Sequence, residues 1–344
     1  MGLLKNFEQP ALIAEISGNH GGSYEKARAL ILESARAGAD FVKLQTYKPE
    51  TITVEGKDGR FLINSGLWKG YRLHDLYAKA MTPWEWHKPL FEYAQELGVT
   101  LISSPFDETA VAFLERTINP VSYKVASFEL NHFPMLTKIG ETQKPVLASI
   151  GVSNEDTILK AIDCLKSAGC PEITLLHCVS EYPAKLESFF LREMPEIKNK
   201  YQTNFGLSDH SSGYLVAVAA TALGASVIEK HITLDRNEDS IDGEFSMLPQ
   251  EFAEMVDAVR ATAKSMGGIR KSKKISKESA LFKRSILLSK DIRMGERLSE
   301  SNIRIARPGD GLCPSLWFNI LGKMIVRDLP VGHPLSLDDI NMAD

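Results

Sequence analysis

The feature that most constrains the fold of this chain is a series of eight short apolar runs, each of which ends in polar residues. Such runs are typical of buried parallel strands, and helical periodicity fills several of the stretches between them. The strand-like runs span residues 11–16, 41–46, 99–102, 122–126, 145–148, 172–179, 205–210 and 225–231, and the helical patterns span 24–37, 83–97, 108–116, 154–168 and 213–223. Because a parallel strand needs a crossover to reach its neighbour, this alternation predicts an α/β fold, and the count of eight favours a (β/α)8 TIM barrel over residues 1–265. A doubly wound open sheet would alternate in the same way.

The length and charge of the chain narrow its class. With 344 residues it can bury a large core, and this length suits one large domain followed by a small one. The net charge of −4 gives no reason to expect a nucleic-acid partner, and no apolar stretch is long enough to predict a membrane span. The four cysteines lack CxxC spacing, which is typical of reduced thiols in a cytoplasmic protein.

Polar side chains follow the strand-like runs at the end where a TIM barrel carries its active site. They are Glu15, Lys43, Gln45, Ser104, Lys124, Ser127, Glu129, Ser149, Ser180, Tyr182, Ser208, His210, Glu229 and His231. We therefore expect a ring of polar groups around one mouth of the barrel.

Two histidines of this ring, His210 and His231, end consecutive runs. If the two strands are neighbours, both imidazoles can hold a divalent metal, with Asp209, Glu229 and Asp242 close enough to orient or complete the site. The alternative is that each histidine only caps its strand through a hydrogen bond.

Two lysines, Lys43 and Lys124, lie inside apolar runs, where an unpaired ammonium group would be costly. Each must pair with a carboxylate or face an anionic ligand. Four hydroxyls on the same rim suit a phosphate and a carboxylate of a small molecule: Ser104, Ser127, Ser149 and Ser208. Together with a metal, these groups indicate an addition to a carbonyl, with the metal as Lewis acid.

Six motifs in this order resemble the sialic acid synthase family: Ala14-Glu-Ile-Ser-Gly-Asn-His20, Val42-Lys-Leu-Gln-Thr46, Ser103-Ser-Pro-Phe106, Tyr123-Lys-Val-Ala-Ser127, Gly206-Leu-Ser-Asp-His210 and Ile228-Glu-Lys-His231. The resemblance covers essentially the whole chain. It implies a transferase that condenses phosphoenolpyruvate with an N-acylated amino sugar, releases phosphate and uses a divalent metal, with Mn2+ expected and Mg2+ or Co2+ as alternatives.

The resemblance also implies roles for individual residues. His210 and His231 would bind the metal, and phosphoenolpyruvate would be held by Lys43, Ser104, Lys124, Ser127, Ser149, Ser180 and Ser208. The sugar side would consist of Glu15, Gln45, Glu129, Tyr182 and Asp242. Glu15 is expected to be the acid or base nearest the reacting carbons, and Asp242 is expected to position the sugar or a metal-bound water.

The C-terminal part of the chain differs in composition from the barrel region. Residues 266–283 contain Gly-Gly and a Lys/Ser run and predict a linker, whereas short apolar runs between turns fill residues 284–344. This last segment resembles the antifreeze-like (SAF) domain of the same family. The resemblance implies a homodimer in which the domain caps the partner's barrel and Arg307 points at the sugar. The alternative is a small module that binds carbohydrate on its own.

The identity of the sugar depends on departures from the N-acetylneuraminate synthase pattern. Phe128, within Ala126-Ser-Phe-Glu129, and Ser180 resemble the pseudaminic acid synthases, whose sugar is 2,4-diacetamido-2,4,6-trideoxy-L-altrose. A bulky Phe128 favours a 6-deoxy sugar over a hydroxylated one. N-acetylneuraminate, legionaminate and spore-coat polysaccharide synthases are the alternatives, the last because of Asn131-His132. Trp68, Trp84 and Trp86 are expected either to line the mouth or to pack in the core.

Two functions of other classes also fit parts of the pattern. A metal-dependent aldolase or hydrolase on the same barrel would work without phosphoenolpyruvate and would not need both Lys43 and Lys124. A non-catalytic sugar-binding protein would place its activity in the antifreeze-like segment. The lysine pair favours the synthase over both.

Overall fold

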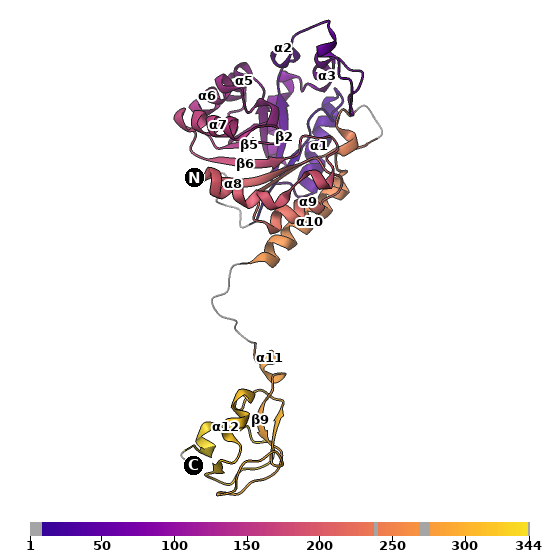
Figure 1. The fold of residues 1–344 in the computed structure, drawn as a ribbon. Coiled ribbons are helices and arrows are strands. Elements are labelled where there is room, and N and C mark those ends of the chain that lie inside the picture. Colours follow the sequence, from indigo (N-terminus) through magenta and orange to yellow (C-terminus); the bar gives the residue numbers. More distant parts are fainter. Residues whose placement is uncertain (1–8, 237–239, 268–275, 343–344) are drawn as a thin grey trace. The chain divides into compact units, whose positions relative to one another are not determined.

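The computed structural model describes residues 9–236, 240–267 and 276–342 (Figure 1). Eight parallel strands form a closed barrel in chain order. They are β1 Ala11–Glu15, β2 Phe41–Thr46, β3 Thr100–Pro105, β4 Tyr123–Val125, β5 Val146–Ser149, β6 Ile173–Cys178, β7 Asn204–Asp209 and β8 Val227–His231. The last strand pairs with the first, so that Ala11 lies opposite Val227 and Glu15 opposite His231. This closure confirms the TIM barrel and excludes the open sheet.

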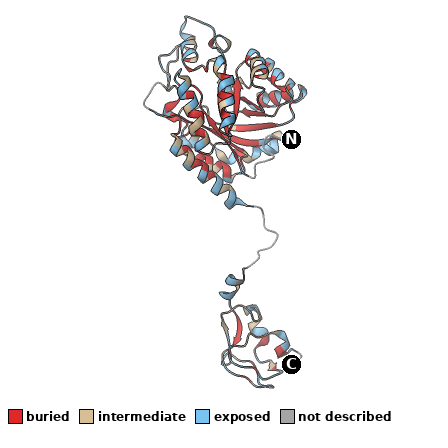
Figure 2. Cartoon of the chain, turned by 180° about the vertical axis from the view of Figure 1, so that it is seen from behind, coloured by how far each residue is buried: buried red, intermediate tan, exposed pale blue. Residues whose placement is uncertain are grey.

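Helices cover the outside of the barrel, with their buried faces toward the strands (Figure 2). Five lie where periodicity predicts them: α1 Tyr24–Arg36, α4 His87–Glu96, α5 Glu108–Thr117, α7 Glu155–Ser167 and α9 Leu215–Ala222. The pattern did not indicate α2 Pro49–Ile52, α3 Leu73–Ala80, α6 Phe133–Glu141, α8 Met194–Tyr201 and α10 Pro249–Met266. No helix in the described ranges is long and apolar enough to cross a membrane.

The barrel interior changes from apolar to polar along the strands. Its apolar layer consists of Ala11, Ile13, Phe41, Ile102, Leu147, Leu176 and Val227. Side chains on a strand alternate between its two faces, so the residue two positions later points to the same face. Those residues are Glu15, Lys43, Ser104, Ser149, Cys178 and Glu229. A polar layer therefore lies directly on the apolar one, toward the carboxyl ends of the strands.

The chain divides into two compact units, Met1–Gly267 and Gly268–Asp344. The second unit contains two antiparallel pairs, β9 Ser285–Leu288 with β10 Ile303–Ala306 and β11 Met324–Ile325 with β12 Ile340–Asn341. Helix α12 Trp317–Ile320 packs on the apolar cluster of this second unit. The predicted linker 266–283 includes the short helix α11 Lys277–Leu281, and residues 268–275 lie outside the described ranges.

Candidate active site

A cavity of about 340 Å³ lies at the carboxyl ends of the barrel strands. Most of the predicted site residues line it: Lys43, Gln45, Lys124, Ser127, Phe128, Glu129, Ser149, Tyr182, Ser208, His210, His231 and Asp242. A pocket of this size with a few convergent polar groups suits a small-molecule ligand.

The floor of the cavity is a buried network of two lysines and two glutamates. Lys43 Nζ contacts Glu15 Oε2 directly and lies 3.9 Å from Glu229 Oε2, while Lys124 Nζ lies 3.5 Å from Glu229 Oε1. Ser208 Oγ donates a hydrogen bond to Glu229 Oε1 at 3.1 Å. The sequence left open whether the lysines pair with carboxylates or face a ligand. Both lysines pair with carboxylates, and both also line the cavity, so they can meet a bound anion.

Burial and charge act differently on the acids and bases of this site. Burial lowers the pKa of Lys43 to about 7. For Glu229, burial opposes ionisation, but Lys124 and Lys43 outweigh it and hold the pKa of that carboxyl below its ordinary value. Burial raises the pKa of Glu129 to about 7. The floor therefore keeps Glu229 ionised, whereas Lys43 and Glu129 can each gain or lose a proton near neutral pH.

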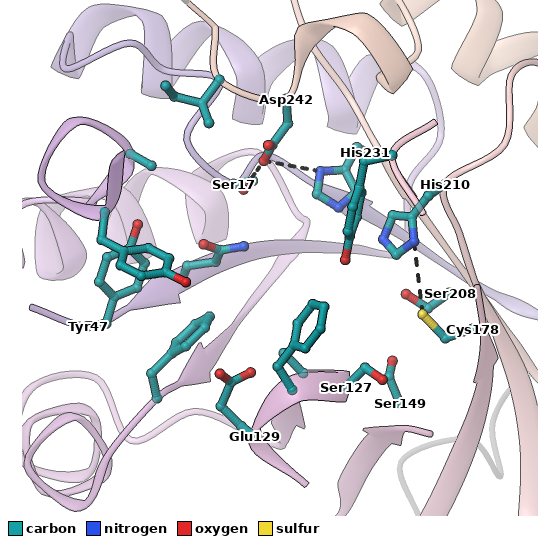
Figure 3. A pocket seen from close by; sticks show the side chains of 18 of the residues that line it. Ser17, Tyr47, Ser127, Glu129, Ser149, Cys178, Ser208, His210, His231 and Asp242 are labelled. Atoms are coloured by element: carbon teal, nitrogen blue, oxygen red, sulfur yellow. Dashed lines mark hydrogen bonds and ion pairs between the residues drawn. The ribbon is translucent and has the colours of Figure 1, made fainter. Parts of the chain in front are cut away.

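The two histidines lie side by side at the cavity wall, with ring centroids 5.3 Å apart (Figure 3). The Nδ1 atom of His210 lies 3.0 Å from the carbonyl oxygen of Val179, which leaves its Nε2 for another partner. His231 Nδ1 lies 3.7 Å from Asp242 Oδ2. Burial first, and then the nearby His210 charge, lower the pKa of His231 well below its ordinary value, so its imidazole is neutral. A neutral imidazole is the form that binds a metal.

These donors fit a divalent transition metal. In the described ranges no cluster of three or more His, Cys, Asp or Glu side chains is arranged to hold an ion. His210 and His231 would supply two nitrogen ligands, and the remaining positions would be left to water or substrate oxygens. Such an incomplete protein shell is typical of catalytic metal sites, which keep positions open.

One wall of the cavity is apolar and comes from the insertion between β2 and α4. Its residues are Ile63, Trp68, Leu73, Leu76, Tyr77 and Ala80, and Tyr47, Phe106, Phe128 and Phe245 extend the same surface. Trp68 Nε1 donates a hydrogen bond to the carbonyl oxygen of Ile241 at 2.9 Å. By contrast, Trp84 stacks on Phe113, and Trp86 packs edge-on against Tyr24. Of the three tryptophans, only Trp68 lines the cavity.

Four predicted site residues do not line the cavity. Glu15 is fully buried within the floor network, where it contacts Lys43, and Ser104 Oγ accepts a hydrogen bond from Lys43 Nζ at 3.1 Å. The Ser180 hydroxyl lies 3.7 Å from Cys178 Sγ. Arg307 belongs to the C-terminal unit, where its Nε donates to the carbonyl oxygen of Phe282 at 2.7 Å.

Several residues that line the cavity were not predicted from the sequence, among them Ser17, Tyr47, Cys178 and Phe245. Ser17 stands two positions after Glu15, and Tyr47 follows β2 directly, so their positions at strand ends were the available signal. Phe245 lies beyond the last strand, where no periodic pattern indicates it.

Comparisons with known proteins match both units. The NeuB family matches residues 30–271 and the SAF domain matches residues 283–341. The pseudaminic acid synthase of Campylobacter jejuni is 41% identical over 95% of this chain and 96% of its own length. The N,N'-diacetyllegionaminic acid synthase of the same species is 34% identical over 92% and 96%. The crystal structure of N-acetylneuraminic acid synthetase from Leptospira borgpetersenii, in complex with citrate, has a TM-score of 0.71 and 29% identity over 79% of this chain and 90% of its own.

Proposed function

Because this chain belongs to the NeuB family, we propose that it condenses phosphoenolpyruvate with 2,4-diacetamido-2,4,6-trideoxy-L-altrose to give pseudaminic acid and phosphate. The observation that carries this proposal is a cavity with lysines and hydroxyls on one side and an apolar wall on the other. The higher identity to a pseudaminic acid synthase than to a legionaminic acid synthase, 41% against 34%, supports the choice of sugar.

In the proposed reaction, C3 of phosphoenolpyruvate adds to the aldehyde of the open-chain sugar, water adds at C2, and the tetrahedral phosphate ester expels phosphate. The ammonium groups of Lys43 and Lys124 hold the phosphate and carboxylate, with hydroxyls from Ser127, Ser149 and Ser208. A bound divalent metal, which we propose to be Mn2+, supplies Lewis acidity toward the aldehyde oxygen.

Proton transfer falls to the acids around the floor. Glu15 lies against Lys43 and can exchange a proton through it, whereas Asp242 faces the cavity beside His231. Glu129, whose pKa is raised to about 7 by burial, faces the sugar side and can donate a hydrogen bond there when protonated.

Two further parts of the proposal concern the protein as a whole. The SAF match supports a homodimer in which Arg307 of the C-terminal unit reaches the partner's sugar site. Its exposed guanidinium can donate hydrogen bonds in pairs to a polar ligand. We place the reaction in the cytoplasm on the cysteine usage described above.

Phosphate release with Mn2+ and a panel of sugars tests the proposed function. We expect release with the trideoxy-L-altrose, loss of release on adding EDTA, and much slower release with the corresponding 6-deoxy-D-mannose derivative and with N-acetyl-D-mannosamine. Faster release with N-acetyl-D-mannosamine would support the proposed reaction but contradict the proposed sugar substrate. No release with any of the three sugars would contradict the synthase itself.

The apolar wall should set the preference for a deoxy sugar. Replacing Phe128, which lines the cavity, with glycine would remove apolar surface and make room for a hydroxyl. We expect the kcat/KM ratio of the trideoxy-altrose to N-acetyl-D-mannosamine to fall about tenfold, because a small group in an apolar pocket discriminates on that scale. The measurement is steady-state kinetics with both sugars.

The matched control for the wall is Phe190→Ala. Phe190 is 68% exposed and is not among the cavity-lining residues, so its loss should leave the ratio unchanged. An unchanged ratio in Phe128→Gly would show that Phe128 does not select the sugar.

A further inference from the structure

The turn that follows β1 holds a residue in an unfavourable backbone conformation. Ser17 has φ of 44°, in the left-handed region that glycine adopts freely and serine does not. The next residue, Gly18, is a glycine, yet the positive φ falls on Ser17. Non-glycine residues held in this way are concentrated at functional sites, where the surroundings maintain them.

The backbone N–H and the hydroxyl of Ser17 contact acids of the candidate site. Its backbone N–H donates to Glu15 Oε1 at 2.6 Å. Its hydroxyl donates to Asp242 Oδ2 at 2.5 Å (Figure 3). Ser17 is only 2% exposed, yet it lines the cavity. The left-handed turn thus joins the end of β1 to the segment that follows β8.

The contact with Asp242 has a further partner. The same oxygen, Asp242 Oδ2, lies 3.7 Å from Nδ1 of His231. This buried nitrogen has no hydrogen-bond partner in the described ranges. The backbone N–H of Asp242 donates to Asn19 Oδ1 at 3.1 Å, so the main chain there is fixed without Ser17. The Ser17 hydroxyl therefore acts on the orientation of the carboxylate.

We infer that Ser17 is a positioning residue, whose hydroxyl orients the Asp242 carboxylate toward His231 Nδ1, 3.7 Å away, and thereby raises metal affinity at Nε2. A carboxylate at one ring nitrogen fixes the tautomer and orientation of a histidine whose other nitrogen binds a metal. This inference rests on the proposed metal-dependent function, and it adds a residue to which the sequence assigned no role.

Two substitutions separate the hydroxyl from the backbone. Ser17→Gly removes the hydroxyl and relieves the backbone strain. Ser17→Ala also removes the hydroxyl but keeps the backbone strain. In the full-length protein, calorimetric titration with MnCl2 should show a Kd about tenfold higher for both variants. The thermal midpoint of Ser17→Gly should equal or exceed that of the wild-type protein. If Ser17 only stabilised the fold, its replacement would lower the thermal midpoint.

A double-mutant cycle with Asp242→Asn tests whether Ser17 acts through Asp242. In the Asp242→Asn background, Ser17→Gly should cause no further loss of Mn2+ affinity. The inference is overturned by unchanged affinity in Ser17→Gly, by a loss confined to Ser17→Ala, or by equal losses in both backgrounds. Phosphate release by the original protein tests the synthase separately, because Mn2+ binding is measured without turnover.

Discussion

Replacing Lys124 with alanine is expected to lower phosphate release from phosphoenolpyruvate about a thousandfold. Lys124 is 2% exposed and lies 3.5 Å from Glu229 Oε1. Without its ammonium group, an incoming phosphate would meet a carboxylate balanced only by Lys43, whose Nζ lies 3.9 Å from Glu229 Oε2. Loss of one charge from a buried site costs far more than loss of a surface charge. Steady-state phosphate release at varied phosphoenolpyruvate measures the effect.

Two variants show whether this loss is specific. Lys160→Ala removes an exposed lysine that pairs with Asp156 at 2.7 Å on α7, and it should leave turnover unchanged. Lys124→Met keeps most of the side-chain volume without the charge, and it should be as inactive as Lys124→Ala. Normal turnover in either Lys124 variant would rule out this lysine as an essential anchor for phosphoenolpyruvate.

Removal of the metal should have an effect of similar size. EDTA is expected to abolish phosphate release from the original protein, and added Mn2+ should restore it. His231→Ala should lose about a thousandfold in phosphate release and should not recover at the same Mn2+ concentration, because it removes one of the two imidazoles that we propose as metal ligands. The decrease in Mn2+ affinity, measured by calorimetric titration, provides a readout besides activity.

His177 on β6, which pairs with β7, provides the control for this experiment. Its Nε2 lies 2.6 Å from the carbonyl oxygen of Phe189, and it does not line the cavity. His177→Gln should therefore bind Mn2+ as tightly as the original protein does. Phosphate release that resists EDTA would contradict a metal-dependent reaction.

The barrel strands and their polar ends were predictable from the sequence. A short apolar run indicates a buried strand, and the first polar residues after the run indicate where the strand ends. Helix α6 was not, because its nine residues include Pro134 and Gly140, which are ordinarily helix breakers. Pro134 lies in the first turn, where proline is tolerated. At Gly140, a Cβ would lie 2.5 Å from the Cβ of Ala168, so glycine permits close packing.

The site residues that the sequence did not reveal depend on contacts between distant segments. Trp68 joins the cavity through a hydrogen bond to Ile241, which lies 173 positions later, and no local periodicity indicates such a pair. Ser17 adopts a conformation that its residue type disfavours, so propensity argues against its observed geometry. The lysines were identified because burial of a charge demands a partner, but only the fold shows that Glu15 and Glu229 are those partners.

The pairing of β1 with β8 affects the order in which the protein folds during its synthesis. The hydrogen bond between Ser17 and Asp242 spans 225 positions, and both flanking strands belong to the same closed barrel. Contacts of such high sequence separation form late, because the intervening chain must first be ordered. During synthesis on the ribosome, Glu15 and Ser17 therefore remain apart from His231 and Asp242 until the chain beyond Asp242 has emerged. The polar floor and the histidine pair of the candidate site are thus completed together with the barrel.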